Sequence, residues 1–160
     1  MKLSTKGRYA MVALTDLALL KEGQLLSLAE IAKRQDISLP YLEQLFVKLR
    51  RAELVASVRG PGGGYKLARP ASEVRVSDIL SAVDETVSAM HTGAGASGGI
   101  SGSRAQSMTN RLWEGLSAHV YVFLHQTRLA DVVQNELRPC PAVPHLFEVV
   151  DEVPPVQDAL

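Results

Sequence analysis

Residues 38–51, which read SLPYLEQLFVKLRR, constrain the fold more than any other stretch of the chain. Apolar residues recur there with the spacing i, i+3, i+4 and i+7, which places them on one face of an α-helix; they are Leu42, Leu45, Phe46 and Leu49. Ser38 is suited to the N-cap, and Pro40 is tolerated in the first turn, where no intrahelical N–H bond is lost. Gln44, Lys48 and Arg51 fall on the opposite face. The stretch therefore predicts a helix with a buried apolar side and a polar outer side.

Two more helices are predicted before this one. The first covers 5–21 and ends before Gly23, with an inner stripe of Tyr9, Val12, Ala13, Leu17 and Leu20. The second runs from Ser27 to about Gln35, because Ser27 and Glu30 form the S-x-x-E pattern of a capping box. Asp36 and Ile37 make a short turn into the third helix.

Two short strands follow, over 54–58 and 65–67, around the turn RGPGGG at 59–64, and then a fourth helix over 77–84. Helix, helix, turn, helix and a two-stranded ribbon is the order of a winged helix-turn-helix. Residues 1–85 are therefore predicted to form such a domain.

The rest of the chain divides into three segments. Residues 86–103 are rich in Gly and Ser and predict a loop. Residues 104–136 predict a long helix, ending near His125, and a short helix capped by Thr127; residues 137–160 form a Pro-rich acidic tail. The long helix has an apolar stripe wide enough to pack against a second copy of the chain, the alternative being that it covers the core of the first domain; the stripe is Met108, Leu112, Leu116, Val120 and Phe123. The expected fold is mainly α with a small β-wing: a winged helix-turn-helix domain plus a long dimerisation helix.

Charge and cysteine content narrow the class of protein. Residues 1–75 hold 13 Lys and Arg against 7 Asp and Glu, a net +6, whereas residues 76–160 hold 4 against 10, a net −6. A basic first half favours a nucleic-acid partner. The single cysteine, Cys140, permits no intrachain disulfide and indicates the cytoplasm. No apolar run approaches a membrane span, and no catalytic motif indicates an enzyme.

The predicted contacts to double-stranded DNA fall into three groups. Ser38, Tyr41, Glu43 and Gln44 start the outward-facing helix and would reach bases or adjacent phosphates in the major groove. The alternative for Glu43 is an ion pair with Lys48 or Arg50. Arg59 would enter the minor groove, where Gly60 keeps bulk away. The remaining predicted contacts are phosphate anchors, namely Lys2, Lys6, Arg8, Lys48 and Arg51.

A glycine run at 93–98 supplies a hypothesis from another class. Gly93, Gly95 and Gly98 match G-x-G-x-x-G, the phosphate-cradling turn of dinucleotide-binding proteins. That turn requires a strand before it and an acidic residue on a second strand. Here a helix precedes it and no second strand follows, so nucleotide binding is kept only as an alternative function.

Three stretches carry a family resemblance: MKLSTKGRYAMVALTDLAL, SLPYLEQLFVKLRRAELVASVRGPGGGYKLA and VSDILSAVDE. They resemble the IscR-type iron-sulfur regulators within the Rrf-type winged-helix transcription factors, closely to about Glu85 and more loosely over 112–133. The resemblance implies a homodimer with crossed long helices and the same major-groove and minor-groove contacts. It also implies a repressor of genes for iron-sulfur cluster assembly and iron homeostasis.

The resemblance fails at the cofactor. Such regulators bind a [2Fe-2S] cluster through three cysteines before the long helix and a histidine at its start. Here Ser107 stands at the position of the last cysteine and Asn110 at that of the histidine, and hydroxyls do not replace thiolates on iron. Three interpretations stay open: the chain is a cluster-independent, ligand-responsive repressor; it builds an atypical site; or its cysteines were removed artificially. The atypical site would use Cys140, with His145 as the sterically possible partner among the histidines.

Overall fold

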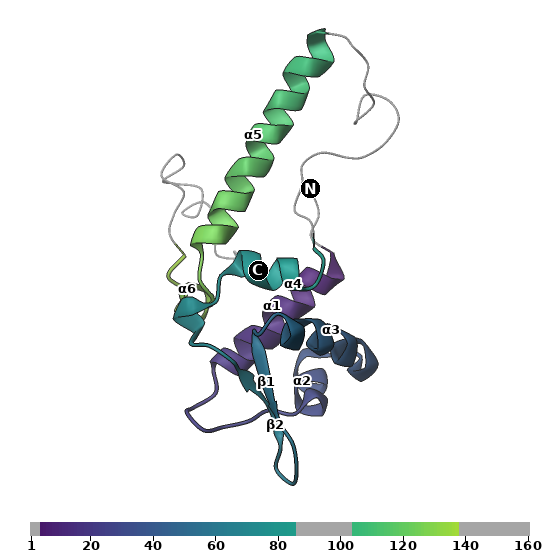
Figure 1. The fold of residues 1–160 in the computed structure, drawn as a ribbon, viewed down its shortest axis with the longest axis vertical. Helices are drawn as coiled ribbons and strands as arrows, with labels where there is room; N and C mark the ends of the chain where they lie inside the picture. The colour runs from purple at the N-terminus through teal and green to yellow at the C-terminus, as the bar shows by residue number, and fades with distance from the viewer. Residues whose placement is uncertain (1–3, 86–103, 138–160) are drawn as a thin grey trace, which may run out of the picture.

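The computed structural model describes residues 4–85 and 104–137 (Figure 1). Three α-helices come first, then an antiparallel hairpin, a 3₁₀ turn and three more helices. Their bounds are α1 Thr5–Ala18, α2 Leu28–Gln35, α3 Leu39–Arg51, β1 Val55–Val58, β2 Gly64–Leu67, η1 Ala71–Glu73, α4 Val76–Ala82, α5 Arg104–Gln126 and α6 Leu129–Val133. This order confirms the winged helix-turn-helix prediction, with a long helix following it.

One hydrophobic core holds the three-helix unit and the hairpin together. The predicted stripe of α3 is buried as expected, with Leu42, Leu45, Phe46 and Leu49 each at most 3% exposed. The ring of Phe46 meets that of Tyr65 on β2 edge-on, with centroids 4.9 Å apart. Burial of a Phe side chain contributes roughly 1.5–3 kcal/mol. The base of the hairpin is thereby fixed to the inner side of α3.

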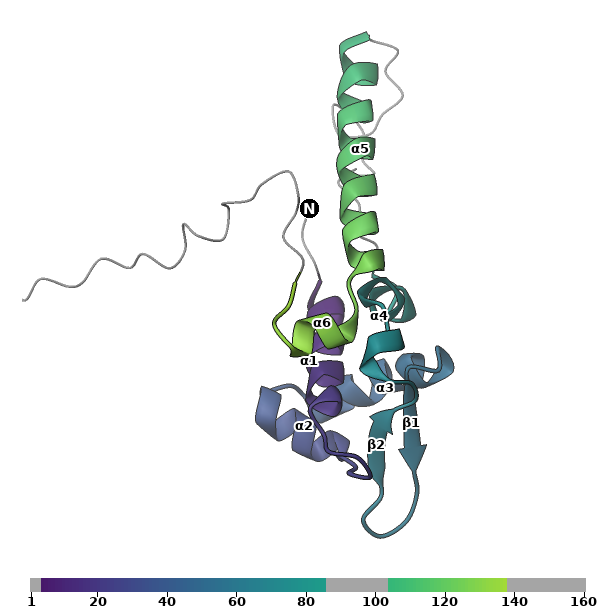
Figure 2. The same ribbon diagram turned by 90° about the vertical axis from the view of Figure 1, so that its left-hand side faces the viewer.

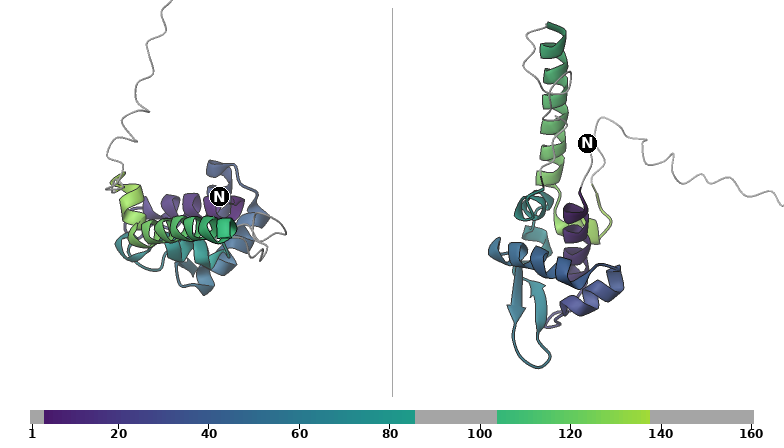
Figure 3. Two further views of the ribbon diagram at one scale, coloured as in Figure 1. Left: turned by 90° about the horizontal axis from the view of Figure 1, so that it is seen from above. Right: turned by 90° about the vertical axis from the view of Figure 1, so that its right-hand side faces the viewer.

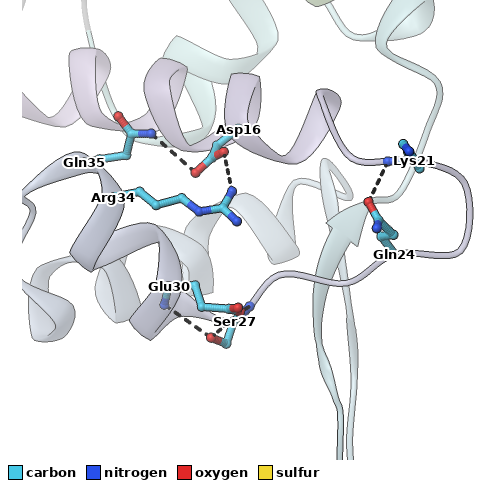
Figure 4. A network of polar contacts seen from close by, with 7 residues as sticks. All are labelled: Asp16, Lys21, Gln24, Ser27, Glu30, Arg34 and Gln35. Atoms are coloured by element: carbon cyan, nitrogen blue, oxygen red, sulfur yellow. Dashed lines mark hydrogen bonds and ion pairs between the residues drawn. The ribbon is translucent and has the colours of Figure 1, made fainter.

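Polar contacts join α1 to α2 (Figure 4). Ser27 and Glu30 form the predicted capping box, with the Glu30 amide donating to the Ser27 hydroxyl at 3.2 Å. Asp16 is 8% exposed on α1 and accepts from the Arg34 guanidinium at 3.1 Å and from the Gln35 amide at 3.4 Å. A buried carboxylate needs such partners, so this cluster fixes the angle between α1 and α2.

The hairpin is a two-stranded ribbon with a tightly packed tip. Val55 pairs with Leu67 and Val58 with Gly64, and the Gly63 amide closes the tip by donating to the Gly60 carbonyl at 2.9 Å. A Cβ on Gly63 would lie 2.3 Å from the Val58 carbonyl oxygen and 2.9 Å from that of Gly60. Only glycine fits there.

The chain returns from α5 to the core through α6, which lies against α1 (Figure 2). The Leu129 amide donates to the Val74 carbonyl at 2.8 Å, and the Val76 amide donates to the Thr127 carbonyl at 3.0 Å. Leu129 is fully buried. These bonds attach the end of α5 to the start of α4.

Several predicted details were wrong. The first helix ends at Ala18, with Leu19 as its C-cap, rather than at Lys21, and the loop that follows turns through Gly23 at φ +82°. Val12 is 40% exposed, and Ala10 and Leu14 occupy the core in its place. The fourth helix covers Val76–Ala82 instead of 77–84, since Asp84 adopts a left-handed φ of +56°.

Two predicted caps also differ. Ser38 occupies the N-cap position of α3, but its side chain makes no capping hydrogen bond. The Thr127 hydroxyl donates back to the Phe123 carbonyl at 2.7 Å, and Arg128 is the N-cap residue of α6. Thr127 therefore ends α5 instead of starting α6.

Helix α5 projects away from the core (Figures 1 and 3). None of its residues is buried within the described chain. Its exposed apolar side chains include Met108 at 63%, Leu112 at 60%, Trp113 at 42% and Leu116 at 41% exposure. The alternative that this helix covers the core of the first domain is therefore wrong.

Candidate nucleic-acid interface

The outer face of α3 is open to solvent in the described chain. Ser38, Glu43, Gln44 and Arg51 are all exposed, as the helical spacing predicts. Gln carries both donor and acceptor and can pair with adenine, whereas the Glu carboxylate can accept from the cytosine amino group. The face thus presents hydrogen-bonding groups over more than one turn of a helix of the width that enters a major groove.

Tyr41 lies on the flank of α3 and is half-buried. Its ring meets that of Tyr9 on α1 edge-on, with centroids 5.7 Å apart and planes at 90°. This contact fixes the orientation of the Tyr41 ring, so its hydroxyl is a pre-positioned donor at the edge of the face.

Lys48 does not pair with Glu43. Its ammonium instead donates to the carboxylate of Asp84, just beyond α4. That hydrogen bond, and the charge of Lys48, lower the pKa of Asp84 below its ordinary value. The side chain of Asp84 is 72% exposed and that of Lys48 is 38% exposed, so solvent screens the pair and it is weak. Lys48 can contact a phosphate only by leaving this carboxylate or sharing it.

The start of α1 brings further cations toward the same end of α4. Lys6 is half-buried and Arg8 exposed, whereas Lys2 lies outside the described residues. Glu85 accepts from the Ser4 amide at 3.0 Å and from the Ser4 hydroxyl. These hydrogen bonds lower the pKa of Glu85, the hydroxyl contributing most. Asp84 and Glu85 thus attach the end of α4 to both α3 and α1.

The wing forms the second exposed surface. Arg59 and Gly60 lie at its tip and are exposed, and Gly60 adopts φ +107°, a conformation that favours glycine. A guanidinium on a slim turn has the size and charge that suit a narrow minor groove. Figure 2 shows the hairpin extending beyond the helices, with its tip free.

The described residues do not fit a metal cluster. Within 4–85 and 104–137 no group of three or more His, Cys, Asp or Glu side chains is placed to hold a metal ion. Ser107 and Asn110, which the sequence resemblance places at ligand positions, lie in α5. His119 contacts the Gly115 carbonyl through Nδ1 at 2.8 Å, and His125 contacts the Arg75 guanidinium and the Ser77 hydroxyl. Cys140, His145, His91 and the Gly93–Gly98 run lie outside the described residues.

Sequence reasoning missed two residues on this surface. Asp84 was assigned only to a helix end, and no local pattern connects it with Lys48, 36 positions earlier. Val47 is 42% exposed on the outer face of α3. Its position in the helical repeat predicts this exposure, but an apolar side chain on a helix is ordinarily assigned to the core.

A three-helix unit with an exposed polar third helix and a glycine-tipped wing defines a winged helix-turn-helix protein. The Rrf2 family, described as an iron-dependent transcriptional regulator, matches residues 3–135. The chain belongs to this family, so it is a transcriptional regulator rather than an enzyme.

The chain is similar along most of its length to regulators of the IscR type. It is 80% identical over 154 residues to the HTH-type transcriptional regulator IscR of Cereibacter sphaeroides, covering 95% of this chain and 99% of that protein. It is 47% identical over 137 residues to IscR of Vibrio atlanticus, covering 84% and 76%. These similarities confirm the resemblance inferred from the sequence motifs.

Solved structures share the fold. The structure of T. potens IscR matches with a TM-score of 0.66 and 35% identity, over 85% of this chain and 88% of that one. CymR of B. subtilis, described as a global cysteine regulator, matches with a TM-score of 0.71 and 30% identity, over 84% of this chain and 98% of that one.

Among the helices of the described residues, none combines the length and the apolar character that a membrane span requires.

Proposed function

We propose that the protein binds a two-part operator as a homodimer and represses genes for iron-sulfur cluster assembly and iron homeostasis. The observation that supports DNA binding is that one domain presents both an exposed polar face on α3 and a free wing tip. The similarity to IscR regulators supports the choice of target genes. Acting on chromosomal genes places the protein in the cytoplasm.

The exposed apolar surface of α5 supports the homodimer. Exposed patches of this kind are rare on monomeric proteins and mark interfaces. A two-fold pair of α5 helices would bury the stripe of Met108, Leu112 and Leu116 and place two copies of α3 on one side of a duplex. Half-sites one helical turn apart, about 34 Å, or a multiple of that distance, are then expected.

The contacts divide by role within this proposal. Ser38, Tyr41, Glu43 and Gln44 lie in the major groove, and Arg59 with Gly60 lies in the minor groove. Lys2, Lys6, Arg8, Lys48 and Arg51 contact phosphates and set affinity and salt dependence rather than sequence preference.

The test separates base contacts from phosphate contacts. Binding sites are selected from a random duplex library with the wild type, Glu43→Ala and Lys48→Ala. Glu43→Ala should change the preferred base at one position per half-site, because the acceptor for a cytosine amino group is lost. Lys48→Ala should weaken all sequences alike and reduce the salt slope by about 1 per contact. A wild type that selects no sequence would contradict the proposed function.

For sensing, we propose a site outside the described residues that uses Cys140, the only thiol, with His145 as its candidate partner. Residues 86–103, at the position of the usual cluster loop, contain no cysteine, and this supports Cys140 over that loop. An atypically ligated [2Fe-2S] cluster is the proposed cofactor. A regulator that responds to another ligand without any cluster is the alternative.

Visible absorbance of anaerobically purified protein discriminates the two. The wild type should be coloured and Cys140→Ala colourless, because a cluster that loses its only thiolate ligand in the chain is no longer held. His119→Ala serves as the control and should keep the colour. A colourless wild type that also fails to take up iron and sulfide would favour the cluster-free alternative.

A further inference from the structure

An apolar side chain lies in the middle of the polar outer face of α3. Val47 is 42% exposed, and its helical neighbours on this face are Glu43, Gln44, Lys48 and Arg51. At 100° per residue, Val47 points about 30° from the direction opposite the buried stripe, against about 70° for Glu43. Val47 is therefore more central on this face than the carboxylate already assigned to a base contact.

The spacing of Val47 is that of a base-reading position. Pro40, Glu43, Gln44 and Val47 are all exposed and follow each other as i, i+3, i+4 and i+7. Homeodomains read bases with four residues of a major-groove helix at the same spacing. Val47 therefore occupies the fourth place in a row whose second and third members are Glu43 and Gln44.

Within the described chain, Val47 is not among the apolar side chains that pack against the core, so core packing does not account for a β-branched residue there. Valine has a lower helix propensity than the polar residues that usually fill exposed helical positions. The surrounding charges also leave no apolar patch on which a protein partner could dock. A single methyl-bearing side chain among hydrogen-bonding groups instead matches the major groove, whose edges are polar except for the thymine C5-methyl group.

We propose that Val47 is a specificity-determining residue that contacts a thymine methyl group beside the bases read by Glu43 and Gln44. The inference rests on the proposed DNA-binding function. One turn of α3 rises about 5.4 Å, so the thymine lies one or two base pairs from the position that Glu43 reads.

The test removes the methyl group from the DNA and from the protein in turn. Duplexes selected by the wild type are synthesised with each half-site thymine replaced singly, and symmetrically, by deoxyuridine. At one position the wild type should lose about three- to fivefold in affinity per half-site, the effect of one buried methyl, and about 10- to 25-fold when both half-sites are changed. Val47→Ala should bind the thymine and deoxyuridine duplexes equally. Val12→Ala, a truncation of a similarly exposed valine on α1, should behave like the wild type.

The outcomes separate this proposal from the proposed function. Suppose that the wild type binds a specific sequence, but that every thymine replacement affects the wild type and Val47→Ala alike. This result would overturn the methyl contact alone. The thymine assignment would also be overturned if replacing a cytosine by 5-methylcytosine raised the affinity only when Val47 is present, while no deoxyuridine replacement changed the affinity. Failure of the wild type to select any duplex would instead count against DNA recognition by α3 as a whole, and with it against this role for Val47.

Discussion

Replacing Leu116 by Glu is expected to convert the protein to a monomer and to weaken operator binding by at least about 100-fold. Leu116 is 41% exposed in the middle of the α5 stripe, and a carboxylate buried between two apolar helices is strongly disfavoured. Linking two binding modules raises affinity by about 10² to 10⁴ without any new contact, and a monomer forfeits that gain. Sedimentation equilibrium gives the mass, and fluorescence anisotropy on the selected duplex gives the affinity.

Ala118→Glu is the matched control for this experiment. It introduces the same side chain on α5, about 140° round the helix from the centre of the stripe, at a position that is already exposed. It should stay dimeric and bind as the wild type does. A Leu116→Glu protein that remained a dimer would contradict the assignment of α5 as the interface.

Gly63→Ala is expected to lower operator affinity by about tenfold or more, as much as Arg59→Ala does. An alanine Cβ would meet the Val58 and Gly60 carbonyl oxygens and lie 3.2 Å from the Arg59 carbonyl carbon. The backbone that carries Arg59 must therefore move. Loss of a hydrogen bond to a charged group costs about 1.5–3 kcal/mol, and the affinity of both single variants for the selected duplex measures this.

The double variant makes the test sharper. If Gly63→Ala acts only by displacing Arg59, combining the two changes should weaken binding no further than either alone. Thermal unfolding should change little, because the contact of Phe46 with Tyr65 anchors the base of the hairpin. Gly23→Ala, at φ +82° with nothing within 4 Å, is the control and should leave affinity unchanged. Additive losses would show that the wing tip contributes something besides Arg59.

Local patterns predicted most of the fold correctly. The capping box at Ser27 and the i, i+3, i+4, i+7 stripe of α3 depend on neighbours within one or two turns, so the sequence contains all that determines them. The ends of α1 and α4 were both placed too far along the chain; α4 is followed by a left-handed residue, whereas the C-cap of α1, Leu19, keeps a right-handed φ of −80°. Asp84 is not a glycine, and its φ of +56° has no reliable signature in the sequence.

The candidate interface was predictable in part, for a similar reason. Exposure of Glu43 and Gln44 follows from the helical repeat. The pairing of Lys48 with Asp84 depends on how α4 packs near α3, which no local pattern determines. Val47 was predictable from the same repeat, but an apolar side chain is usually assigned to the core unless its angle on the helix is calculated.

Because Lys48 is paired with Asp84, a DNA phosphate must compete with the Asp84 carboxylate for the Lys48 ammonium. A phosphate that takes Lys48 leaves the Asp84 carboxylate without its cation, and the pKa of that carboxyl should then rise toward its ordinary value. Any event that favours a released Asp84 favours the DNA complex, and linkage requires DNA to favour that event by the same factor. Asp84 lies two positions before residue 86, the start of the segment 86–103 that the sequence resemblance places at the cluster-loop position. A ligand that acts on this segment could therefore be detected in two ways. It should change the affinity for the operator, and the operator should change the affinity for that ligand by the same factor.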